Sequence, residues 1–356
     1  MNLTLNVTLD RKDLVKALAP LAPLALLVKG ASSLPLRQVR ISAYAAAAFP
    51  KYEAAFRVYN GLQELKISVP TTDATVPGTV ALGVKELLKF ARSAKSPLVT
   101  IRGDGMVVSG AISVKLPTCP LADLPEATVK RTFEHSATID LEAIRRVAYA
   151  RCESQPCMSG VLLESDAEGT THTVATDGRR MAVVRRCGSA PAYELLIPSE
   201  VVGVILSAPA EEAQASWGED YLSLQTATYH LITPLSGEKF PPWRKVVPAA
   251  YNRAPIALPR RELLAVLKSA GGAKRGVVLS ASEDGDTIVE CAELGLSARL
   301  AAAWTGDPLG VNPRYLREAC DSFGGETVTL EPAPSANEPL VLREGDYTAV
   351  VLPVRM

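Results

Sequence analysis

Apolar and polar residues alternate along most of the chain, and six segments replace this alternation with apolar residues at helical spacing. The six segments are 9–18, 84–95, 139–151, 198–208, 258–268 and 311–321. In the first of them, Leu14, Ala17, Leu18 and Leu21 would share one helical face. Strand-like alternation follows the helices, for example at 98–101 and 106–108. The pattern predicts an α+β fold with helices packed on one face of sheets.

The helical segments recur in a fixed order. Segments 9–18, 139–148 and 258–267 each place Asp or Pro after an apolar residue and then begin a helix. A second type of helix follows each of them, at 84–91, 198–205 and 312–319. Such a repeat predicts three similar domains of about 120 residues, each with two helices. We place them at 1–128, 129–251 and 252–356, because Pro and charged residues interrupt the periodicity near both boundaries.

The longest apolar stretch, 17–28, contains Pro20 and Pro23. Because proline removes a backbone donor, we expect this stretch to be too broken for a regular helix, and it is too short to span a membrane. Residues 1–13 lack the basic and apolar regions of a signal peptide. We therefore expect a soluble protein without a membrane segment, located in the cytoplasm.

The chain has 356 residues, of which 47% are hydrophobic, and its 38 basic and 38 acidic residues give no net charge. This balance excludes a uniformly cationic nucleic-acid binder, although a basic surface remains compatible with it. The six helical segments hold 15 basic and 9 acidic residues, a net charge of +6. Equivalent helices of a repeat point in equivalent directions, so recurring cations favour a common binding surface over an ordinary solvated face. The cations in question are Lys12, Lys16, Lys85, Lys89, Arg92, Arg145, Arg146, Arg260, Arg261, Arg314 and Arg317.

Motifs for catalysis are scarce. There is no phosphate-binding loop, no dinucleotide fingerprint and no His-Glu-x-x-His zinc motif. Cys152, Cys157 and His172 are the one group that a thiol enzyme or a zinc site could use, and small buried residues in a reduced protein explain them more simply. The sequence therefore predicts neither a metal nor a cofactor, and a thiol enzyme on a repeat scaffold is a remote alternative.

Several strings in the chain match the motifs of one known family. Residues 175–182, Ala-Thr-Asp-Gly-Arg-Arg-Met-Ala, are similar to that family's Ala-Thr-Asp-Gly-His-Arg-Leu-Ala. Residues 237–248, Gly-Glu-Lys-Phe-Pro-Pro-Trp-Arg-Lys-Val-Val-Pro, resemble its Gly-x-Phe-Pro-Asp-Tyr-x-x-Val-x-Pro, with one residue inserted. Further similarity lies at 116–125, 159–164 and 346–356, and together these strings resemble the bacterial sliding clamp, the β subunit of DNA polymerase III. Residues 38–70 depart from the family, because Ala43-Tyr-Ala-Ala-Ala-Ala48 does not look like its usual strand pair.

The resemblance implies a DNA-clamp fold of three tandem domains and a head-to-tail homodimer closed around duplex DNA. In this arrangement the six helices line the hole, and residues 98–114 of one protomer pair with residues 288–304 of the other. The implied function is a non-catalytic processivity factor that binds DNA without reading its sequence. It would act in replication in the cytoplasm, at the nucleoid. A clamp-fold paralogue with a specialised role in repair or inhibitor binding is the alternative.

The resemblance also implies a pocket between the second and third domains. There the replicative polymerase, clamp loader subunits and repair polymerases dock through short linear motifs. Carried over position by position, the pocket is lined by Met158, Thr176, Gly178, Arg179, Arg180, Met181, Pro241, Lys245, Val246, Val350, Val351, Leu352, Pro353, Val354, Arg355 and Met356. Arg179 replaces a common His of the family and Lys245 a common Arg, so a different peptide preference is expected. Val354 and Met356 are expected to be free to line the groove.

Overall fold

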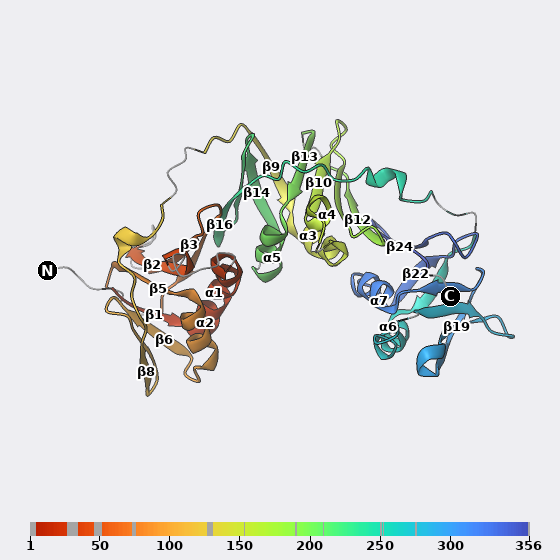
Figure 1. Ribbon diagram of the computed structural model, residues 1–356, viewed down its shortest axis with the longest axis horizontal. Coiled ribbons are helices and arrows are strands. Elements are labelled where there is room, and N and C mark those ends of the chain that lie inside the picture. Colours follow the sequence, from red (N-terminus) through yellow and green to blue (C-terminus); the bar gives the residue numbers. More distant parts are fainter. Residues whose placement is uncertain are drawn as a thin grey trace. The chain divides into compact units, whose positions relative to one another are not determined.

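The protein, seen in a computed structural model, is divided into two compact units (Figure 1). Unit 1 comprises Met1–Leu141 and Glu200–Leu235, and unit 2 comprises Glu142–Ser199 and Ser236–Met356. The structure describes residues 5–26, 35–45, 52–72, 76–126, 131–152, 154–188, 191–208, 210–249, 251, 253–274 and 276–354. Within these residues each unit has one eight-stranded and one four-stranded antiparallel sheet.

The larger sheet of unit 1 has the order β5-β2-β3-β4-β16-β15-β14-β9. Its strands are β2 (Gln38–Ala45), β3 (Tyr52–Tyr59), β4 (Glu64–Pro70), β5 (Gly78–Gly83), β9 (His135–Asp140), β14 (Glu212–Trp217), β15 (Tyr221–Gln225) and β16 (Tyr229–Pro234). The smaller sheet, in the order β1-β6-β7-β8, contains β1 (Asn6–Asp10), β6 (Leu98–Arg102), β7 (Met106–Ser109) and β8 (Ile112–Lys115). The pairing of β4 with β16, in which Leu65 lies opposite Leu231, makes the larger sheet continuous.

Three α-helices belong to unit 1 in its described residues: α1 (Arg11–Leu26), α2 (Val84–Ser93) and α5 (Ser199–Ser207). Of two short 3-10 turns, η2 (Pro35–Arg37) lies between α1 and β2, and η3 (Leu121–Asp123) lies between β8 and β9. Helix α2 buries Val84, Leu87, Leu88 and Ala91, the face that its spacing predicts. No helix in the described part of the chain is long and apolar enough to cross a membrane.

Helix α1 corrects one expectation, because it continues through both prolines to Leu26. Asp10 starts the helix, since its carboxylate accepts from the backbone N–H of Lys12 at 2.7 Å. The apolar side of the helix is fully covered, and Leu14, Leu18, Leu21, Leu24 and Ala25 are all at most 1% exposed. This burial outweighs the loss of two backbone hydrogen bonds, so tertiary packing keeps helical a segment that its local sequence disfavours.

The larger sheet of unit 2 has the order β13-β10-β11-β12-β24-β23-β22-β17. Its strands are β10 (Val161–Ser165), β11 (Thr171–Thr176), β12 (Arg180–Arg186), β13 (Tyr193–Ile197), β17 (Ile256–Pro259), β22 (Thr327–Glu331), β23 (Leu340–Glu344) and β24 (Tyr347–Val351). The smaller sheet, β20-β19-β18-β21, contains β18 (Val277–Ala281), β19 (Asp286–Cys291), β20 (Leu296–Ala303) and β21 (Leu309–Val311). The helices and turns are α3 (Leu141–Val147), η4 (Ala148–Ala150), α4 (Pro156–Ser159), η5 (Trp243–Lys245), α6 (Arg260–Ser269), η6 (Ala292–Leu294) and α7 (Pro313–Asp321).

The predicted α+β class and the six predicted helices are confirmed, since α1, α2, α3, α5, α6 and α7 fall on the six segments. The alanine-rich region that departs from the family nevertheless forms regular strands in its described part. There β2 and β3 pair, with Ile41 opposite Phe56. The predicted second domain, 129–251, contributes β9 and β14–β16 to unit 1 and β10–β13 to unit 2. Its boundaries stay predictions, because continuous sheets cross them.

The proline in the exposed part of α1 offers a test of the packing argument. Pro23→Ala restores a backbone N–H that can donate to the carbonyl of Ala19, so the free energy of unfolding should rise by about 1 to 3 kcal/mol. Denaturation by urea measures the change. Pro117→Ala, at an exposed position outside the helices, is the matched control and should leave the value within about 0.5 kcal/mol. An equal effect of both variants would contradict the argument.

Candidate functional site

The candidate site in unit 2 is built on a buried apolar cluster drawn from four strands and one turn. The cluster consists of Leu162 on β10, Val174 on β11, Met181 and Val183 on β12, Trp243 on η5 and Val350 on β24. Strand pairing sets this arrangement, because Met181 lies opposite Thr176 on one side and opposite Val350 on the other. The half-buried side chains of Phe240 and Val247 pack against the cluster.

The turn between β11 and β12 forms one edge of the candidate site, and the sequence of this turn explains its conformation. Gly178 has φ +81°, a left-handed conformation in which a side chain would be strained. Asp177 Oδ1 accepts from the backbone N–H groups of Arg179 and Arg180 at 2.9 and 3.0 Å. Thr176 Oγ1 accepts from the N–H of Gly178 and donates to the carbonyl of Arg180. This fixed turn leaves the side chain of Arg179 exposed.

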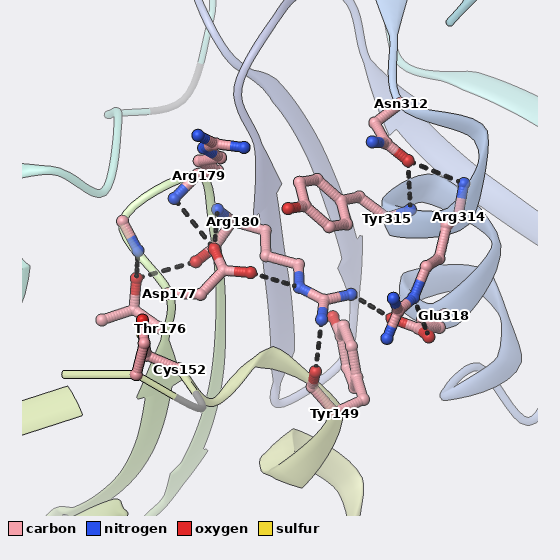
Figure 2. A network of polar contacts seen from close by, with 12 residues as sticks. Tyr149, Cys152, Thr176, Asp177, Arg179, Arg180, Asn312, Arg314, Tyr315 and Glu318 are labelled. Atoms are coloured by element: carbon pink, nitrogen blue, oxygen red, sulfur yellow. Dashed lines mark hydrogen bonds and ion pairs between the residues drawn. The ribbon is translucent and has the colours of Figure 1, made fainter. Parts of the chain in front are cut away.

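Arg180 is at the centre of a polar network inside unit 2 (Figure 2). Its Nε donates to Asp177 Oδ2 at 3.0 Å, its Nη2 donates to the carbonyl of Tyr149 at 2.7 Å, and its Nη1 donates to Glu318. The guanidinium also lies over the ring of Tyr315, 4.4 Å from its centroid, and 5.3 Å from the centroid of Tyr149. With its side chain 5% exposed, Arg180 is enclosed by residues of its own unit.

The segment after β16 places Trp243 in the cluster and surrounds it with charged groups. The ring of Trp243 lies 5.3 Å from that of His172 and 4.6 Å from the guanidinium of Arg244. Arg244 also forms an ion pair with Glu164, and His172 Nδ1 lies 3.8 Å from the same carboxylate. Burial first, and then the positive charge of Arg244, lowers the pKa of His172 from its ordinary value of 6.5. His172 therefore supports the packing of Trp243 as a neutral ring.

Backbone hydrogen bonds attach the described end of the chain to unit 2, while the expectation that Val354 lines the groove stays a prediction. Leu352 N donates to the carbonyl of Arg179 at 2.9 Å, which continues the pairing with β12. Val354 N then donates to the carbonyl of Gly310 on β21 at 2.9 Å, and Pro353 forms a bridge with Val311. The last residues described here are thus attached to the smaller sheet of unit 2.

The predicted pocket residues fall into three groups by exposure. The buried ones are Met158, Thr176, Arg180, Met181, Val350 and Val351. The half-buried ones are Pro241, Leu352, Pro353 and Val354, and the exposed ones are Gly178, Arg179, Lys245 and Val246. Arg355 and Met356 lie outside the described residues. Sequence reasoning did not name Trp243 or Phe240 as site residues, although both stand in the Phe-Pro-Pro-Trp string that signals this segment.

The predicted DNA-facing residues differ in how far they are available. Those that are exposed are Lys12, Lys16, Lys85, Lys89, Arg92, Arg261 and Arg314. Three of them, Lys85, Lys89 and Arg92, border a groove of about 660 Å³ between α1 and α2, whose floor includes Ala19, Ala22 and Leu88. The spacing on α2 therefore puts these three cations on one surface.

Arg146 differs from the exposed cations. It forms ion pairs with Glu344 at 2.7 Å and Asp346 at 3.0 Å and lies over the ring of Tyr347. Arg260 is half-buried and donates to the carbonyls of Cys320 and Asp321. Since their guanidinium groups already have acceptors inside unit 2, we leave both out of the DNA-facing set, while half-buried Arg145 and Arg317 stay predictions.

The group proposed for thiol or zinc chemistry finds no support in the geometry. Cys152 Sγ contacts the hydroxyl of Ser154 at 3.5 Å, and His172 faces Glu164 and Arg244. Among the described residues, no three His, Cys, Asp or Glu side chains are placed to hold a metal ion.

Comparison with solved structures places this fold among the sliding clamps, the β subunits of bacterial DNA polymerase III. A Pseudomonas aeruginosa clamp bound to griselimycin is 21% identical with a TM-score of 0.77, and a Bartonella birtlesii clamp bound to griselimycin is 19% identical with a TM-score of 0.78. The β subunit of Thermotoga maritima is 15% identical with a TM-score of 0.77. Each match covers 99% of this chain and 100% of the other. No protein-family model and no curated protein matches the chain.

The lowered pKa of His172 predicts a pH-dependent stability. Because the folded state disfavours the imidazolium, the contribution of His172 is complete above pH 6.5 and is lost as the pH falls through the lower pKa of the folded state. His172→Gln cannot titrate, so the difference in Tm between wild type and this variant should shrink between about pH 7.5 and pH 5. Thermal unfolding followed by tryptophan fluorescence measures it. Burial also lowers the pKa of His230, but that effect is common to both proteins and cancels. Parallel pH profiles would contradict the role given to His172.

Proposed function

We propose that the protein is a sliding clamp, a non-catalytic processivity factor that encircles duplex DNA and tethers other proteins to it. The observation that carries this proposal is the fold match over 99% of this chain and 100% of several sliding clamps. Such a clamp would act on chromosomal DNA in the cytoplasm. Its partners would be the replicative polymerase, clamp loader subunits and repair polymerases.

Ring closure would use the edges of the two smaller sheets. In unit 1 the order β1-β6-β7-β8 ends at β8, and in unit 2 the order β20-β19-β18-β21 begins at β20. Pairing β8 of one protomer with β20 of another would build a further eight-stranded sheet like the two already present. Ile112 on β8 is 55% exposed, as an edge that awaits a partner would be. This supports a head-to-tail homodimer through residues 98–114 and 288–304.

Binding to DNA would be electrostatic and independent of sequence. The cations on α1 and α2 have no ion-pair partner among the described residues, and ammonium or guanidinium groups in this state attract phosphates. A closed ring needs little affinity, because it can leave circular DNA only by opening. Retention would therefore be topological and the phosphate contacts would guide sliding.

Retention on nicked circular DNA tests the proposal. The protein, loaded with a compatible clamp loader, should stay on the circle during gel filtration and be released once the DNA is linearised. Replacing Lys85, Lys89 and Arg92 with Glu should reduce loading and lower the salt dependence of residual binding by about one unit of slope per lost phosphate contact. Glu86→Gln, an exposed change on the same helix, is the control that keeps the three cations. Equal retention on circular and linear DNA would refute encirclement.

Short linear motifs would dock on the surface of the apolar cluster in unit 2. Val246 is 52% exposed beside the buried Trp243, so it offers an apolar contact that a partner could cover. Arg179 and Lys245 are exposed cations at the same site, where the family's common residues are His and Arg. These two differences favour a modified peptide preference, which is also what a specialised paralogue would need.

A surface variant tests this docking site without disturbing the core. Val246→Glu should weaken a labelled peptide of the Gln-Leu-x-Leu-Phe type about tenfold or more, because it places a charge where an apolar anchor would bind. Fluorescence anisotropy gives the Kd. Leu62→Glu, at a position 67% exposed in unit 1, is the matched control and should bind as wild type does. If both variants bind alike, the docking site lies elsewhere.

A further inference from the structure

We propose that Arg180 is a positioning residue and that Glu318 links the peptide site to Arg314, a predicted DNA-facing residue of α7. The proposal rests on the proposed function and concerns how its two binding events influence each other. Its basis is a chain of contacts within unit 2, drawn in Figure 2, in which one carboxylate serves two guanidinium groups.

Each of the three guanidinium nitrogens of Arg180 already donates to an acceptor within unit 2. Nε, Nη1 and Nη2 donate to Asp177, Glu318 and the carbonyl of Tyr149, respectively. Aromatic rings lie beside the guanidinium as well, and the side chain is 5% exposed. A residue enclosed in this way acts on a ligand only through the residues it holds. The resemblance predicts that Arg180 lines the pocket directly, whereas its burial and internal contacts favour a position behind the lining.

At one end, the contacts of Arg180 fix the peptide site. Asp177, which binds Arg180 Nε, also accepts the two backbone N–H groups that shape the turn before β12. Arg180 itself precedes Met181 of the apolar cluster and lies opposite Val351 in the sheet. Stronger hydrogen bonding to Arg180 should therefore order both the turn before β12 and the apolar cluster that forms the floor of the peptide site.

At the other end, the contacts reach α7. Glu318 Oε1 accepts from Arg314 Nε at 3.0 Å, while Oε2 accepts from Arg180. The Arg314 side chain is 62% exposed, so a phosphate can reach it. Asn312 caps the helix by accepting from the N–H of Arg314 at 2.9 Å. Burial alone would raise the pKa of Glu318, but hydrogen bonds from Arg180 and Arg314 outweigh it and hold the pKa below its usual value.

The shared carboxylate gives the coupling its sign. When a DNA phosphate binds Arg314, that guanidinium divides its attraction between phosphate and Glu318, and the carboxylate then interacts more strongly with Arg180. The turn and the floor become better ordered, so the peptide loses less conformational freedom in the site when it binds. DNA should therefore tighten peptide binding, and by linkage the peptide should tighten DNA binding by the same factor.

The experiment measures the Kd of a labelled Gln-Leu-x-Leu-Phe peptide for the full chain, with and without a saturating short duplex at low salt. Wild type should bind the peptide about threefold to tenfold more tightly with DNA. In Glu318→Gln the ratio of the Kd without DNA to the Kd with DNA should fall to one. Glu262→Gln removes an exposed carboxylate from α6, another predicted DNA-facing helix, and should keep the wild-type ratio.

Arg314→Gln separates this coupling from a merely structural role and, being at an exposed position, should fold. Without Arg314 the carboxylate is left to Arg180, so the peptide should bind without DNA as tightly as it binds wild type with DNA. The ratio should again be one. A wild type that binds both ligands independently, or a ratio unchanged in Glu318→Gln, would overturn the coupling and leave the clamp proposal intact. A wild type that binds neither peptide nor DNA would overturn both.

Discussion

The pairing of β12 with β24 is the interaction on which the candidate site depends. It joins residues 180–184 to residues 347–351, which are far apart in the chain, and makes the larger sheet of unit 2 continuous. Through it Met181 meets Val350, and Leu352 goes on to bond with the carbonyl of Arg179. Trp243 can then close the cluster from a segment that belongs to neither strand. In unit 1 the pairing of β4 with β16 makes the larger sheet continuous in the same way.

Local periodicity was enough to predict the helices but not the sheets. The six helical segments have apolar faces that repeat every three or four residues, and all six form helices. Alternation predicts a strand without naming its partner, so the two continuous sheets that cross the expected domain boundaries could not be inferred. The expectation drawn from Pro20 and Pro23 was wrong for a related reason. Helix propensity describes an isolated helix in water, whereas α1 is stabilised by packing of its buried face.

The local shape of the candidate site was predictable from the sequence, but its contacts were less so. The Thr-Asp-Gly string predicts a tight turn, and the structure has this turn with Gly178 at positive φ. What the sequence could not reveal is which charges are already paired. Five consecutive residues of β12, from Arg180 on, are buried, so alternation does not separate its two faces. The partner of Arg180, Glu318, lies 138 positions further along the chain, and only the folded structure brings the two together.

Ion pairs and hydrogen bonds within the chain also reduce the number of cations that can attract a phosphate. A net charge of +6 over six helical segments suggests a surface that attracts phosphates uniformly. However, the guanidinium groups of Arg146 and Arg260 already bind acceptors of unit 2. Helix α5 carries no cation at all. The exposed cations that remain gather mainly on α1 and α2, and even the exposed Arg314 shares Glu318. Few and unevenly spaced cations would attract phosphates only weakly, which suits the topological retention on DNA that we propose, since strong contacts would oppose sliding.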